Sequence, residues 1–80
     1  DFLVPTASGI LPVEVKSGKS GTLRSMHQFL LRSGNRIGVR LYSGTTLDQE
    51  HNVTLDGAVL RYRLISLPLY LAGELDSIRL

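Results

Sequence analysis

The sequence contains no cysteine and only two histidines, His27 and His51. Without thiols the chain cannot form a disulfide framework, a cysteine-ligated zinc or iron–sulfur site, or a thiol nucleophile. Two histidines are too few for a histidine-rich metal centre. The absence of cysteine also favours a reducing, cytoplasmic setting.

Long apolar runs are missing as well. No run reaches the roughly 18 residues that a membrane span requires, so no membrane partner is expected, and no signal-peptide pattern opens the chain. Hydrophobic residues make up 42% and charged residues 20% of the sequence, which is the composition of a globular domain. Nine Lys and Arg against seven Asp and Glu give a net charge of +2, which permits nucleic-acid binding without arguing for it.

The length of 80 residues predicts one small domain over 1–80, since a second hydrophobic core would need more chain. The sequence begins at Asp1, without Met and within a predicted strand. We therefore expect a fragment of a longer polypeptide.

The first part of the chain has the pattern of a β-hairpin. Apolar segments at 1–4 and 10–16 flank a turn at 5–9 that contains Pro, Ser and Gly, and a gap of this size suits a hairpin. The second segment is rich in β-branched residues, which favour strands.

A β-α-β unit is predicted next. A helix is expected over 22–33, with Gly34 suited to end it. Residues 36–42 alternate apolar and polar, which predicts a strand parallel to 10–16 after a right-handed crossover. The helix prediction rests on apolar residues at helical spacing, namely Leu23, Met26, Phe29 and Leu30.

The last part of the chain is patterned less clearly. Residues 51–55 predict a short strand between turns, and 59–65 predict a late strand. Ser66 is a candidate N-cap of a C-terminal helix, with Pro68 in its first turn. The whole pattern predicts an α/β fold: a small mixed β-sheet with a crossover helix and a C-terminal helix.

Three charged residues are expected to meet at one end of this sheet. Glu14 and Lys16 are two positions apart on a strand, so they project from one face. Val13 and Val15 project from the other face, which we expect under the helix. The hairpin brings Asp1 near the pair. Asp and Glu oxygens suit Mg²⁺, and a lysine can stabilise developing negative charge, so the trio predicts metal-assisted phosphodiester hydrolysis.

These residues carry a family resemblance. Asp1 and, thirteen positions later, Glu14-Val15-Lys16 resemble the PD-(D/E)xK nuclease-like superfamily. Residues 1–4 and 11–21, followed by a helix and a strand, resemble more closely the DUF4143 family, the C-terminal domain of bacterial and archaeal AAA-type ATP-binding proteins. Residues 67–71, Leu-Pro-Leu-Tyr-Leu, are similar to the closing segment of that family. The resemblance covers most of the chain.

The resemblance implies a restriction-endonuclease-like core. It implies that Asp1 and Glu14 are ligands of Mg²⁺ and that they form the catalytic set with Lys16. ATP binding would belong to an N-terminal ATPase domain of the same polypeptide, which is then the first expected partner. The superfamily often has a further acidic residue on a helix before the first strand, and the sequence given does not include that region.

A nucleic-acid contact is predicted at the loop before the helix. Gly18-Lys19-Ser20 is not a P-loop, because Val13 occupies the position of the first glycine of that motif. The loop and the helix N-terminus could still hold a phosphate, with Lys19 and Arg24 adding positive charge. The alternative is ordinary solubilising charge. A basic strand face, or again a solvated outer face, is expected from Arg36, Arg40, Arg61 and Arg63.

Two functions remain open from the sequence. The first is a nuclease-like domain with Mg²⁺-dependent hydrolysis of DNA. The second is a catalytically inactive nucleic-acid-binding, protein-binding or structural module attached to the ATPase, in which Glu14 and Lys16 belong to a solvated strand face or to a relic of the nuclease site.

Overall fold

A computed structural model describes residues 2–7, 9–16 and 23–77 of the chain. The elements in chain order are β1 (Phe2–Thr6), β2 (Gly9–Val15), α1 (Arg24–Ser33), β3 (Ile37–Tyr42), β4 (Leu47–Leu55), β5 (Ala58–Pro68) and the 3-10 helix η1 (Leu69–Ser77). The strands form one mixed sheet in the order β1-β2-β3-β5-β4. This confirms the predicted α/β fold.

The N-terminal hairpin and the β-α-β unit are present. Strand β1 is antiparallel to β2, with Phe2 opposite Val13. Strand β3 is parallel to β2 and, on its other side, to β5. Helix α1 ends at Gly34, which has a left-handed conformation (φ 80°) and donates its N–H to the Leu30 carbonyl at 3.1 Å, as expected for a C-terminal glycine.

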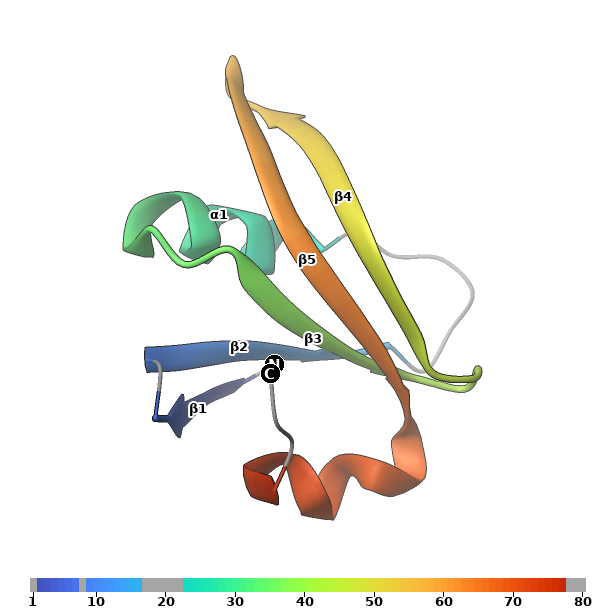
Figure 1. Cartoon of the computed structure of the whole chain (residues 1–80). Coiled ribbons are helices and arrows are strands. Elements are labelled where there is room, and N and C mark those ends of the chain that lie inside the picture. The colour runs from blue at the N-terminus through green and yellow to red at the C-terminus, as the bar shows by residue number, and fades with distance from the viewer. Residues whose placement is uncertain (1, 8, 17–22, 78–80) are drawn as a thin grey trace.

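Each face of the sheet has its own hydrophobic core, and Figure 1 shows α1 on one side of the sheet and η1 on the other. Successive strand residues point to opposite faces, so β5 contributes Leu64 to one core and Ile65 to the other. The buried residues of the hydrophobic core on the α1 side are Met26, Leu30, Leu60, Tyr62 and Leu64. Those on the η1 side are Leu11, Val13, Val39, Leu41, Ile65, Leu67 and Leu75.

One expected orientation is reversed. Val13 is buried in the η1-side core, whereas Glu14 faces α1, so the prediction that Val13 and Val15 lie under the crossover helix is wrong. The alternation along β2 is as predicted. Helix α1 lies on the face of Glu14, whose carboxylate accepts an N–H from the first turn of that helix, a contact that hydrophobic patterning does not show.

In the C-terminal part, the two strands are longer than predicted and the helix begins later than predicted. Strand β4 extends over nine residues and forms a long hairpin with β5, closed by Asp56 and Gly57, both with positive φ (52° and 83°). Ser66 is not an N-cap: it is fully buried within β5. Strand β5 continues to Pro68 because β3 pairs with it as far as that residue and β4 as far as Ser66. The terminal helix is a 3-10 helix that begins at Leu69.

No helix among the described residues is long and apolar enough to cross a membrane.

Candidate functional site

Glu14 is a buried carboxylate beneath the first turn of α1. Its side chain is 4% exposed, and its Oε1 accepts the backbone N–H of Met26 at 3.2 Å. The residue before the helix, Leu23, has no side chain that could cap α1. The first turn of a helix leaves N–H groups without intrahelical partners, and a negative charge there is favourable. Glu14 therefore acts as a cap that comes from another element.

Lys16 projects from the same face as Glu14, as predicted, and the two side chains form an ion pair. Its Nζ is 3.0 Å from Glu14 Oε2, although this oxygen has no partner in hydrogen-bond geometry. The Lys16 backbone N–H donates to the Leu41 carbonyl at 2.8 Å, which extends the pairing of β2 with β3 by one residue. The Lys16 side chain is 26% exposed, so the ammonium lies between the buried carboxylate and solvent.

A polar row crosses the sheet beside this pair. Glu14 lies opposite Arg40 in β3, and Arg40 lies opposite Ser66 in β5, so all three project from the α1 face. Arg40 donates from Nε and Nη2 to Ser66 Oγ at 3.1 and 2.8 Å. Its guanidinium carbon lies 4.7 Å from the centre of the Tyr42 ring. The local sequence does not show this arrangement, because the pattern around Ser66 predicts a helix cap.

Two histidines flank a buried tyrosine on the same face. His27 Nε2 is 2.8 Å from the Tyr62 hydroxyl oxygen, and the His51 ring centre lies 5.8 Å from that of Tyr62. Burial lowers the pKa of His27; the negative Glu14 opposes this and His51 adds to it. Burial also raises the pKa of Tyr62. This cluster favours neutral His27.

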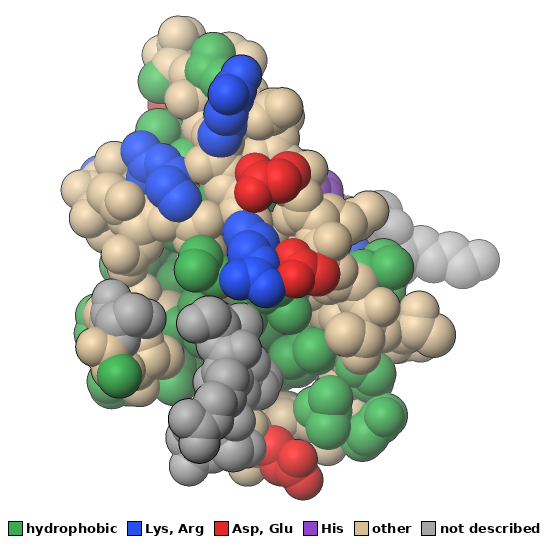
Figure 2. Space-filling view, in the orientation of Figure 1, with side chains coloured by type: hydrophobic (Ala, Val, Ile, Leu, Met, Phe, Trp, Pro, Cys, Tyr) green, Lys and Arg blue, Asp and Glu red, His purple; other side chains and the backbone are tan. Residues whose placement is uncertain are grey.

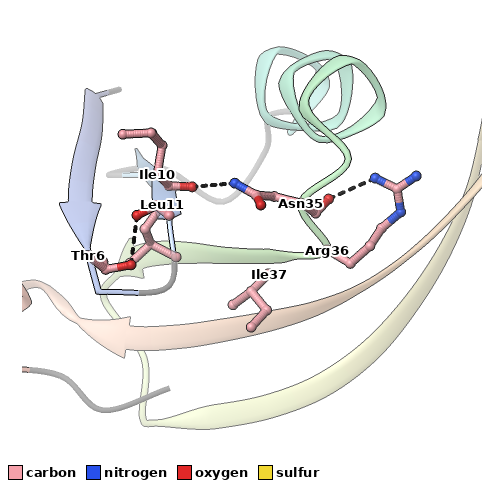
Figure 3. A pocket seen from close by; sticks show the side chains of 7 residues that line it. Thr6, Ile10, Leu11, Asn35, Arg36 and Ile37 are labelled. Carbon is pink, nitrogen blue, oxygen red and sulfur yellow. Dashed lines mark hydrogen bonds between the residues drawn. The ribbon is translucent and has the colours of Figure 1, made fainter.

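Two depressions border the N-terminal hairpin. One of about 180 Å³ adjoins Glu14 and is otherwise mainly apolar. Its lining residues are Phe2, Leu3, Pro12, Val13, Glu14, Ser25, Met26 and Phe29. The other, of about 130 Å³, lies between the hairpin turn and the start of β3 (Figure 3). There Asn35 Nδ2 donates to the Ile10 carbonyl at 2.6 Å, and Arg36 Nη1 donates to the Asn35 carbonyl at 2.8 Å. The first of these bonds ties the segment after α1 to β2.

The structure brings together part of the predicted site. Glu14 and Lys16 are in contact, whereas Asp1 and Lys19 lie outside the described residues. Phe2 pairs with Val13. The prediction that the hairpin brings Asp1 near Glu14 and Lys16 requires this register. Arg24 is exposed at the first position of α1.

The predicted basic strand face is not one face. Arg40 shares the α1 side with Ser66, whereas Arg63 lies opposite Ile37 on the η1 side. Arg63 is also neutralised there by a two-pronged contact with Asp48, at 2.9 and 2.6 Å. Figure 2 shows basic and acidic side chains interspersed on the visible face rather than gathered into one basic patch.

The described donors at the site do not by themselves fit a resident Mg²⁺. They include no group of three or more His, Asp or Glu side chains that could hold a metal ion. Glu14 is the one acidic residue of the predicted set among them, and its two oxygens face the Met26 N–H and the Lys16 ammonium. A metal at this site would require the second predicted ligand, Asp1.

Comparisons with models of known families, with curated proteins and with solved structures found no match for the chain. The resemblance to the DUF4143 family therefore stays a prediction based on the residues quoted above.

Proposed function

We propose that the chain is the nuclease-like C-terminal module of an AAA-type ATP-binding protein of the DUF4143 kind, and that it binds DNA without cleaving it. The observation that carries the absence of cleavage is the state of Glu14. Its carboxylate caps α1 through Oε1 and lies in ion-pair contact with Lys16 through Oε2, so both oxygens are already engaged. The N-terminal ATPase domain would be its covalent partner, and a cysteine-free sequence suits a cytoplasmic location.

The energetics support a structural role for the pair. A buried carboxylate is costly unless it is hydrogen-bonded and paired with a cation, and Glu14 has both contacts here. A metal ion at Oε2 would have to displace the Lys16 ammonium, which lies 3.0 Å from that oxygen. The same residues that resemble a nuclease motif therefore stabilise the attachment of α1 to the sheet.

A Mn²⁺ titration followed by ¹H–¹⁵N NMR tests this role. We expect no selective paramagnetic broadening at Phe2, Val15 and Lys16, and the same response in Glu14→Gln. Glu50→Gln is the matched control, because Glu50 is an exposed carboxylate on β4. Broadening centred on Glu14 that is lost in Glu14→Gln and kept in Glu50→Gln would contradict the proposal.

Mg²⁺-dependent hydrolysis of DNA is the second candidate, and one observation favours it. Phe2, the residue after Asp1 in the sequence, pairs with Val13, the neighbour of Glu14 in β2. Asp1, Glu14 and Lys16 would then be the catalytic set. Cleavage of DNA by the intact protein in the presence of Mg²⁺, abolished in Glu14→Gln, would establish this function and exclude the first.

A further inference from the structure

We infer that Arg40 is a phosphate contact of the DNA-binding face, an inference that rests on the proposed binding of DNA. Arg40 lies near the carboxyl end of β3, between parallel strands β2 and β5. In open α/β sheets, ligands bind outside the carboxyl ends of the parallel strands. Helix α1 also begins at this edge, since it follows β2 in the chain.

The Arg40 side chain is held in one orientation. Ser66 Oγ accepts N–H groups from two of its nitrogens, and Ser66 is fully buried. The guanidinium lies over the Tyr42 ring, and the Tyr42 hydroxyl donates to the Thr45 carbonyl at 2.6 Å. Gly44 packs so closely against the Tyr42 ring that a methyl group there would lie 2.5 Å from it. A cation fixed in this way loses little entropy when it binds an anion.

The charge of Arg40 is not neutralised within the described part of the chain. No carboxylate there lies within ion-pair distance of Arg40, whereas Lys16 pairs with Glu14 and Arg63 with Asp48. Glu14 is the register neighbour of Arg40, but its oxygens are engaged by α1 and Lys16. Arg40 is half-buried, so solvent screens its charge less than that of an exposed arginine.

The remaining donors of Arg40 suit a phosphate. Arginine has five N–H groups in a planar fork, and Ser66 accepts two of them. The fork geometry matches two oxygens of a phosphate. Arg36 is less suited to bind a phosphate, because its Nη1 already donates to the backbone carbonyls of Leu30 and Asn35.

Fluorescence anisotropy with a short labelled DNA duplex at several salt concentrations tests the inference. Arg40→Gln should weaken binding by roughly three- to tenfold. It should also make the fall of log affinity with log salt shallower, by about one in the slope. The control is Arg61→Gln, which removes the same charge from an exposed position on β5. This control should bind as the unmodified protein does.

The outcomes separate the inference from the proposed function. Absence of binding by the unmodified protein would overturn both. Binding that Arg40→Gln and Arg61→Gln weaken equally, or not at all, would overturn the role of Arg40 alone. Inorganic phosphate that shifts the Arg40 Nε resonance while DNA does not would identify a free-anion site and overturn the DNA contact. If Arg40→Gln fails to fold, Arg40→Lys keeps the charge without the fork. It should bind more weakly than the unmodified protein, and equal binding would contradict the inference.

Discussion

The Oε1 atom of Glu14 accepts the backbone N–H of Met26 at 3.2 Å, and this bond joins strand β2 to the first turn of α1. The two residues are twelve positions apart in the chain. Met26 is also buried in the core between α1 and the sheet, so one residue of the helix is fixed by both a polar and an apolar contact. The attachment of α1 therefore depends on a carboxylate that the sequence presents as a catalytic candidate.

Glu14→Ala is expected to destabilise the protein by about 1–3 kcal/mol, because it leaves the Met26 N–H without its partner in a buried setting. Chemical denaturation measures the change. Glu14→Gln should lose less, since an amide oxygen can still accept the N–H. Glu50→Ala, at an exposed position, should stay within about 0.5 kcal/mol. Equal effects of Glu14→Ala and Glu50→Ala would refute the capping role.

Lys16→Met should destabilise the protein by about 1–2 kcal/mol, because the buried Glu14 loses the cation that offsets its burial. The partial exposure of Lys16 keeps this value below that of a fully buried pair. In the double variant Lys16→Met with Glu14→Gln, much of the loss should be recovered. A double variant whose losses simply add would show that the two charges do not interact.

Stability is expected to fall as the pH is lowered from about 7 toward 5, a window set by the pKa of His27. Burial lowers this pKa in the folded protein from its usual 6.5, so below pH 6.5 the unfolded chain binds the proton more readily than the folded one. Glu14 opposes the shift and His51 adds to it, while the Tyr62 hydroxyl contacts the imidazole directly. Urea unfolding at a series of pH values measures this slope.

His27→Gln provides the control for the pH dependence, because glutamine is uncharged and can still bond to the Tyr62 hydroxyl. The slope of stability against pH between about 5 and 7 should become flatter in this variant. A slope that stays the same would assign the pH dependence to other groups.

Gly38→Ala should destabilise the protein by about 1–3 kcal/mol, because an added methyl group would collide with Sδ of the buried Met26. Thermal unfolding followed by circular dichroism measures the change. Gly73→Ala is the matched control, since nothing lies within 4 Å of the corresponding position in η1. If both variants unfold at the same temperature, α1 does not press on β3 as closely as the structure indicates.

Local patterns accounted for most of the elements. Alternation predicted β3, turn residues predicted the N-terminal hairpin, and Gly34 marked the end of α1. The sequence predicts a shorter strand than β4, because residues 47–50 are exposed and mostly polar, and they form a strand by pairing with β5. Ser66 differs from its prediction for a similar reason: its local pattern is that of a helix cap, and pairing on both sides of β5 overrides that pattern.

The sequence by itself determined the α/β class, the hairpin register and the shared face of Glu14 and Lys16, because each follows from residues close together in the chain. Only the tertiary structure decided which face of β2 lies under α1. It also decided that Glu14 caps that helix, and that Arg40 of β3 meets Ser66 of β5. These contacts join residues twelve and twenty-six positions apart, so they are set by how the elements pack and leave no pattern in the local sequence.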